Sequence, residues 1–190
     1  MERRFFDLKI DVYVPGRWYL TTPTTLDGRR VDYVWEFSDG KRMEYPERLR
    51  VPVSRPGKPL DYSSAGVGLT PVVNERIASV FRDIAPGDVQ LFPVSIDDQR
   101  EEYFLLNVAH TVRCIDDAAC GEVQFYGPDD GRPDLIGEYR AVLGLRIDKT
   151  RVGDERVFRL WGWRTPIIVD GELKDALERA GITGGRFDEV

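Results

Sequence analysis

The spacing of hydrophobic and polar residues divides the chain into many short strands. From Leu8 to Val14 apolar and mixed residues alternate, which is typical of a strand with one buried face. Residues 102–112 contain a continuous apolar core, which predicts a strand buried on both faces at the centre of a sheet. The same pattern predicts further strands at residues 89–96, 122–126, 141–147, 156–161 and 166–169.

Two helices are predicted from their periodicity and end signals. Thr70-Pro71 resembles a helix start, and the apolar residues at 73, 77, 80, 81 and 84 then share one face. Asp170 is a suitable N-cap for a second helix, which Gly181 ends in a left-handed conformation that lets Ile182 contact Leu177. Because strands outnumber helices, we expect an α+β fold with a mainly antiparallel sheet and two or three helices.

Four prolines lie between residues 46 and 59, where they disfavour continuous strand pairing. This segment separates two parts of the chain. We expect residues 1–55 to form a strand-rich N-terminal extension packed on the core, and residues 56–190 to form the α+β domain.

The composition is that of a soluble globular protein, with 42% hydrophobic and 32% charged residues. No apolar run reaches the roughly 18 to 20 residues that would span a bilayer, so we expect no membrane association. The N-terminus lacks the apolar run of about 7 to 15 residues that a secretory signal needs, and only two cysteines occur. These features predict a cytoplasmic protein with reduced thiols.

Acidic residues concentrate in the middle of the chain. The net charge is −6 overall, whereas residues 82–136 alone carry 12 acidic and 4 basic residues, a local net charge of −8. Such a segment repels nucleic-acid phosphates and accelerates encounter with a basic protein. We therefore expect a protein partner and no nucleic acid.

The residues that usually carry chemistry are sparse. His110 is the only histidine, and with Cys114 and Cys120 it forms a spacing that does not match structural zinc sites. A small hydrolase or transferase that uses one of these cysteines with His110 is the alternative function. Neighbouring carboxylates in a strand point to opposite faces, so they do not converge on a metal ion. We expect no catalytic residues, no metal and no cofactor.

Several segments together resemble the myxobacterial-type immunity proteins of bacterial polymorphic toxin systems. The resemblance covers about residues 56–190 and includes Thr70-Pro-Val-Val-Asn-Glu-Arg-Ile, Pro86-Gly-Asp-Val-Gln-Leu-Phe-Pro-Val, Tyr103-Phe-Leu-Leu-Asn-Val, Cys114-Ile-Asp, Phe158-Arg-Leu-Trp, Thr165-Pro-Ile-Ile-Val and Gly181-Ile-Thr-Gly-Gly-Arg-Phe. It implies an antidote that binds a cognate toxin and blocks it, and it carries over no catalytic residue.

The acidic segment then predicts where a toxin binds. Nuclease toxins must hold polyanions, so a basic nuclease is the kind of partner that carboxylates would attract. Trp161 and Trp163 share a strand face with Arg159, and they either add aromatic contacts or pack in the core. The candidate toxin-binding residues are Asp97, Asp98, Glu101, Glu102, Asp116, Asp117, Trp161 and Trp163. The sequence does not indicate the oligomeric state.

Overall fold

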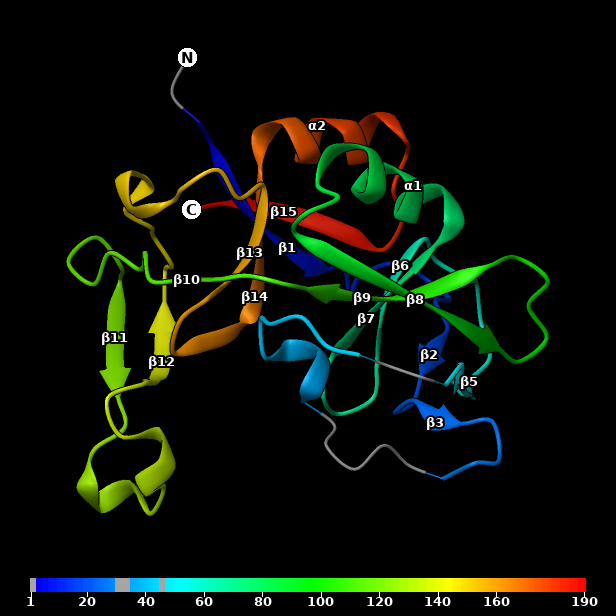
Figure 1. Ribbon diagram of the computed structural model, residues 1–190, viewed down its shortest axis with the longest axis horizontal. Helices are drawn as coiled ribbons and strands as arrows, with labels where there is room; N and C mark the ends of the chain where they lie inside the picture. The colour runs from blue at the N-terminus through cyan, green and yellow to red at the C-terminus, as the bar shows by residue number, and fades with distance from the viewer. Residues whose placement is uncertain (1–2, 30–34, 45–46) are drawn as a thin grey trace.

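The computed structural model describes residues 3–29, 35–44 and 47–190. In this part of the chain the strands form a five-stranded, an eight-stranded and a two-stranded sheet, accompanied by two α-helices. Figure 1 shows the helices side by side above the two larger sheets, while the two-stranded sheet extends away from them on the left.

The five-stranded sheet joins the beginning of the chain to its end. Its order is β10-β13-β14-β1-β15, so the first strand lies between two strands from the last third of the sequence. β1 is antiparallel to both neighbours, and β10 is parallel to β13. The strands are β1 (Phe5–Ile10), β10 (Thr111–Val112), β13 (Val157–Leu160), β14 (Trp163–Asp170) and β15 (Gly185–Glu189).

The eight-stranded sheet has the order β3-β4-β8-β9-β7-β6-β2-β5, with parallel pairing only at β4–β8 and β2–β6. β9 lies near its middle, which confirms the position predicted for the continuous apolar run. The strands are β2 (Tyr19–Leu20), β3 (Thr24–Thr25), β4 (Leu49–Val51), β5 (Val53–Arg55), β6 (Tyr62–Ala65), β7 (Thr70–Asn74), β8 (Val89–Ile96) and β9 (Tyr103–Val108).

The two-stranded sheet consists of β11 (Glu122–Phe125) and β12 (Tyr139–Leu143), which are antiparallel. Short 3-10 helices occupy the connections: η1 (Glu36–Ser38), η2 (Pro128–Asp130), η3 (Pro133–Leu135) and η4 (Lys149–Arg151). The loop that contains η2 and η3 forms the far tip of the projecting arm in Figure 1.

The first helix begins later than its sequence signal suggested. Residues Thr70–Asn74 form strand β7, and α1 (Glu75–Ile84) starts only after Asn74, whose side chain accepts a hydrogen bond from Ile77 N. The predicted start at Thr70-Pro71 is therefore wrong, because pairing of β7 with β6 and β9 buries all five of its residues.

The second helix, α2 (Gly171–Arg179), begins as predicted. Asp170 caps it by accepting a hydrogen bond from Leu173 N, and Gly181 follows it with a φ of 71°. Ile182 N then donates to the carbonyl oxygen of Leu177 at 3.2 Å. This return of the chain lets Ile182 pack against the core beneath the helix.

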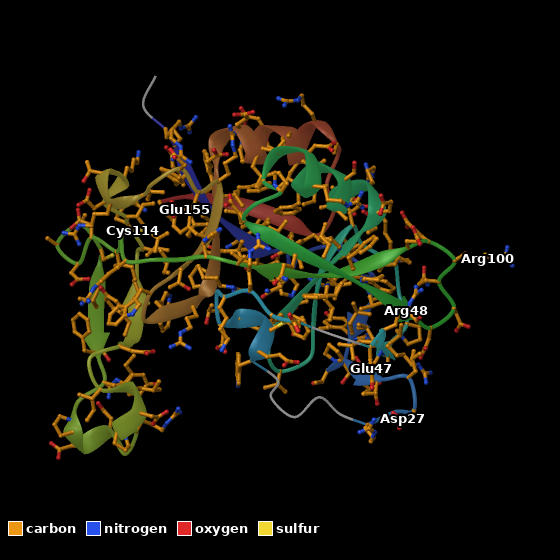
Figure 2. All side chains as sticks on the ribbon, viewed as in Figure 1. Asp27, Glu47, Arg48, Arg100, Cys114 and Glu155 are labelled. Atoms are coloured by element: carbon orange, nitrogen blue, oxygen red, sulfur yellow. The ribbon has the colours of Figure 1, made fainter. Side chains whose placement is uncertain are left out.

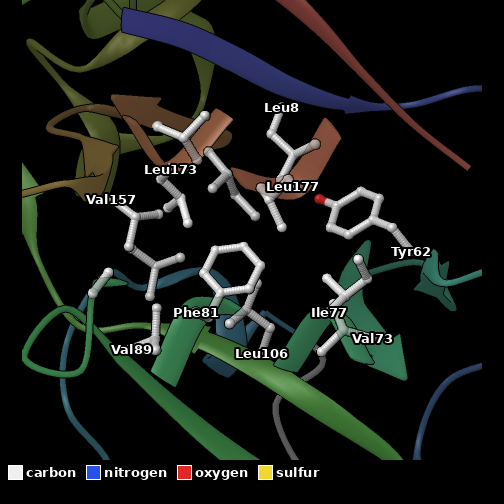
Figure 3. Close-up of a cluster of buried hydrophobic side chains, with 14 of the residues drawn as sticks. Leu8, Tyr62, Val73, Ile77, Phe81, Val89, Leu106, Val157, Leu173 and Leu177 are labelled. Atoms are coloured by element: carbon white, nitrogen blue, oxygen red, sulfur yellow. The ribbon is translucent and has the colours of Figure 1, made fainter. Parts of the chain in front are cut away.

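The main core lies between both helices and both large sheets. Figure 3 shows Phe81 of α1, Leu173 and Leu177 of α2, Leu8 of β1 and Leu106 of β9 converging on it. A second cluster around Trp18 and Tyr103 belongs to the eight-stranded sheet. A third cluster around Phe5, Phe158 and Cys114 covers the opposite face of the five-stranded sheet.

This architecture confirms an α+β fold with mainly antiparallel strands, and the two α-helices are the smaller of the two numbers expected. Strands from residues 1–55 pair with strands from residues 56–190, as β4 does with β8. The division of the chain at residue 55 stays a prediction. None of the helices in the described ranges has the length and apolar character needed to cross a membrane.

Candidate functional site

Two neighbouring inner strands of the five-stranded sheet, β14 and β1, separate along their length. β1 pairs with β14 only from Phe5 to Asp7, opposite Ile168–Asp170. Beyond that point β1 continues with β15 as far as Ile10, whereas the first half of β14 pairs with β13 only at Trp163. The divergence leaves an opening in the sheet instead of a continuous ladder.

A cavity of about 890 Å³ occupies this opening. Residues of β1, β14 and β15 form one part of its wall, residues of β2 and β6 form another, and the end of β12 with the residues that follow it forms a third. All three sheets therefore contribute to a single cleft, which we call the three-sheet cleft. Its volume lies within the range of about 300 to 1,000 Å³ that is typical of binding pockets.

The entrance of the three-sheet cleft carries large apolar side chains that are open to solvent. Val12 is 63% exposed, Tyr19 46%, Leu69 49% and Leu143 58%, and all four line the cavity. Together they make up four of the ten large hydrophobic residues that are exposed in the described chain. Grouped apolar side chains with a polar surround mark interaction sites on soluble proteins.

Arg159 lies against the cleft but is only 2% exposed. Its Nη1 donates hydrogen bonds of 2.8 and 2.9 Å to the carbonyl oxygens of Arg164 and Thr165. These carbonyls belong to a bulge in β14, where three extra residues separate the pairs that β14 makes with β13. Burial lowers the pKa of Arg159 to about 10, so its guanidinium stays positively charged at neutral pH.

Asp7 is the buried acid of the cleft, at 5% exposed. Burial raises the pKa of Asp7 although Lys9 lies 3.4 Å away and opposes the shift. Lys9 also donates to Asp188 of β15 at 2.7 Å. Lys9 therefore pairs with both of these acids on this side of the cleft.

Four of the candidate acids, Asp97, Asp98, Glu101 and Glu102, lie in or beside the turn between β8 and β9. Asp97 accepts two hydrogen bonds from Arg50, at 2.7 and 2.9 Å. Glu101 accepts a bond of 3.0 Å from the side-chain amide of Asn74. We call these four residues the hairpin acids; they are mostly exposed, and two of them support local structure.

The other two candidate acids lie in the loop between β10 and β11. Asp116 accepts hydrogen bonds from two backbone amides that follow it, and Asp117 accepts a bond of 2.6 Å from the hydroxyl of Tyr139. Figure 2 labels Arg100 beside the hairpin acids at one end of the molecule and Cys114 near the second group at the other end. The structure therefore does not bring the six acids onto one surface.

The two candidate tryptophans have different surroundings. The guanidinium of Arg113 lies 4.0 Å from the ring centre of Trp161. Trp163 is partly buried against the third core cluster and also lines the three-sheet cleft. Of the eight candidate residues, Trp163 alone lies in the wall of the cleft.

His110 and the cysteines do not assemble into one site. The imidazole of His110 lies 3.4 Å from Asp88, while Cys114 is fully buried in the third core cluster and burial raises the pKa of its thiol to about 12. Cys120 Sγ accepts a bond of 3.3 Å from the backbone amide of Arg146. Within residues 3–29, 35–44 and 47–190, no group of His, Cys, Asp or Glu side chains is arranged to hold a metal ion.

The three-sheet cleft was not predicted from the sequence, although one signal was present. Arg159 interrupts the apolar run Val157–Leu160, and Asp7 likewise follows two phenylalanines. Charged residues are rarely buried without a partner, so a charge inside an apolar strand indicates a special environment. The pattern does not show which other segments complete that environment.

Comparison with known proteins extends the resemblance found in the sequence. No curated protein matches the chain. The immunity protein family (Imm11) matches residues 9–190, which include most of the segment before residue 56 and all described strands except the first four residues of β1. Since this match spans nearly the whole chain, the protein belongs to the immunity protein family Imm11.

Proposed function

We propose that this immunity protein neutralises its cognate toxin by direct, stoichiometric binding in the cytoplasm and has no enzymatic activity of its own. Membership of the immunity protein family is the observation that carries the proposal. The arrangement of the thiols agrees with it, because a buried thiol with a raised pKa is a poor nucleophile.

A titration of toxin with immunity protein separates binding from catalysis. The toxin encoded beside this gene is purified, and its activity is measured at increasing amounts of the immunity protein. A binder stops the toxin completely at a fixed molar ratio, and the toxin keeps its mass. Inactivation of a large excess of toxin, or a covalent change in toxin mass, would instead identify the hydrolase or transferase alternative.

The proposal also includes the class of toxin that is bound. The local charge of −8 over residues 82–136 supports a toxin with a basic surface, and a nuclease has such a surface because it binds polyanions. We assign the first encounter with that surface to the hairpin acids. Charges of this kind mainly increase the association rate, whereas tight binding needs a desolvated anchor elsewhere.

A further inference from the structure

The basic side chains of the three-sheet cleft differ in whether they form salt bridges. Lys9 is paired with Asp7 and Asp188. The three arginines Arg17, Arg146 and Arg159 form no ion pair with any carboxylate in the described part of the chain. The cleft therefore differs from the acidic surface of the remaining molecule.

The arginines are held in place by backbone carbonyls instead of acids. Arg17 Nη1 donates to the carbonyl oxygen of Asp11 at 2.7 Å, and Arg146 Nη1 donates to that of Leu145 at 2.8 Å. Arg159 makes its bonds to carbonyls in the same way. The Nε atoms of Arg17 and Arg159 are buried and have no hydrogen-bond partner within the described chain. These contacts orient the guanidinium groups without engaging them in salt bridges.

The acids around the cleft are already engaged. Asp188 is bonded to Lys9 and lies 3.4 Å from Arg186, and Glu189 forms a bidentate pair with Arg4. The cleft thus contains three arginines without a salt bridge inside a protein whose net charge is −6. A cation in a partly desolvated cleft attracts carboxylates more strongly than one on an open surface does.

Apolar contacts accompany this charge. Arg17 lies over the ring of Tyr19 at 5.4 Å, and Leu143 is exposed on the same cavity as Arg146, three residues further along the chain. Arginine and aromatic residues are enriched at the centres of protein interfaces, where they supply much of the binding energy. A partner that fits must offer carboxylates beside apolar side chains.

We propose that the three-sheet cleft binds an acidic, partly apolar surface segment of the cognate toxin, with toxin carboxylates facing Arg17 and Arg146 and apolar toxin side chains covering the rim. The proposal rests on the proposed function, since it takes the toxin as partner. It adds a second contact of opposite sign to the one assigned to the hairpin acids. A toxin with a basic active surface and a separate acidic segment would satisfy both.

The first test compares two charge reversals at exposed arginines. R146E changes the cleft, and R179E makes the same change at the exposed end of α2, outside both the cleft and the hairpin turn. With an inactivated form of the neighbouring toxin as probe, we expect R146E to weaken binding about tenfold or more and R179E to stay within about twofold of wild type. Equal thermal unfolding of both variants shows that the fold is intact. Equal affinities would overturn the proposal.

A second measurement locates the contact. Hydrogen exchange with and without the toxin should show new protection at residues 8–10, 142–146 and 163–167, and on one acid-containing toxin segment. Replacing the acids of that segment with lysine should weaken wild-type binding and restore binding to R146E, as expected for charges in contact. Protection elsewhere, a second copy of this chain in the cleft, or a small molecule retained there would overturn the proposal. Wild-type neutralisation, measured in parallel, tests the proposed function separately.

Discussion

Arg159 Nη2 donates a hydrogen bond of 3.1 Å to the carbonyl oxygen of Phe37, and this bond joins β13 to η1 across 122 residues of sequence. The same guanidinium holds two carbonyls of the β14 bulge. A single side chain therefore ties the five-stranded sheet to the segment that packs against the eight-stranded sheet.

We expect R159M to lower the free energy of unfolding by about 2 to 5 kcal/mol, because one buried and two partly buried carbonyl oxygens lose their donor. R159K keeps the charge but cannot reach all three acceptors, so its loss should be partial. Urea unfolding measures the free energy of unfolding of both variants, with R100M as the control at an exposed arginine. A stability of R159M equal to that of wild type would show that the bulge does not depend on this residue.

The cap of α1 can be separated from the other contacts of Asn74. N74A removes the acceptor for Ile77 N and should cost about 0.5 to 2 kcal/mol, whereas N74S keeps an acceptor there. Asn74 also donates to Asp61 at 2.7 Å and to Glu101 at 3.0 Å, and neither variant retains these bonds. Thermal unfolding of the two variants gives the contribution of the cap by difference. Identical losses would mean that the amide donor, not the cap, is what matters.

Asp7 should make stability depend on pH. Burial raises its pKa above the unfolded value of 3.8, so the folded state binds a proton more readily than the unfolded state does. The free energy of unfolding should therefore decrease as pH rises from about 4 through the raised pKa. D7N removes this dependence while retaining nearly the same shape. Urea unfolding at several pH values between about 4 and 7 tests it, and parallel curves for wild type and D7N would contradict it.

The hairpin acids should affect how fast the toxin is captured. Asp98 and Glu102 are exposed, and asparagine tolerates the φ of 60° at Asp98, so D98N/E102Q removes two charges with little effect on the fold. We expect a several-fold slower association rate at low salt, a smaller effect at high salt and an almost unchanged dissociation rate. E44Q/D154N makes the same change in net charge at other exposed positions. If both double variants associate equally slowly, only the overall charge matters.

The cysteines should be dispensable for protection. C120A removes a partly exposed thiol, and C114A removes a buried one at a cost in stability of about 1 kcal/mol or more for the lost packing. We expect cells that express C114A/C120A to survive the toxin as wild-type cells do at the same protein level. Loss of protection by C120A alone, with normal stability, would instead favour the thiol-dependent enzyme.

The sequence predicts those elements whose signals are local. Asp170, the apolar stripe and Gly181 lie within one short segment, so α2 could be placed correctly. Thr70-Pro71 also has local helix signals, yet β7 is a strand because β6 and β9 hydrogen-bond to it from both sides. Competition of this kind between local preference and long-range pairing cannot be read from the segment itself.

The cleft is harder to predict because no single segment encodes it. It depends on the separation of β1 from β14, on the position of β2 and on the residues after β12, which come from distant parts of the chain. The apolar neighbours of Arg159 in the sequence do indicate that this charge has an unusual environment. The excess of acidic residues favoured the six candidate acids in exposed turns as the binding site. None of these six acids lines the cleft.

The position of β1 between β14 and β15 also sets the timing of assembly during synthesis. β1 is translated before the other described strands, whereas both strands that hydrogen-bond to it are translated after them. Until then its two edges are unpaired, a state that invites aggregation or chaperone binding. The five-stranded sheet therefore cannot close around β1 until β15 has been translated, which makes the pairing of β1 a late step of assembly.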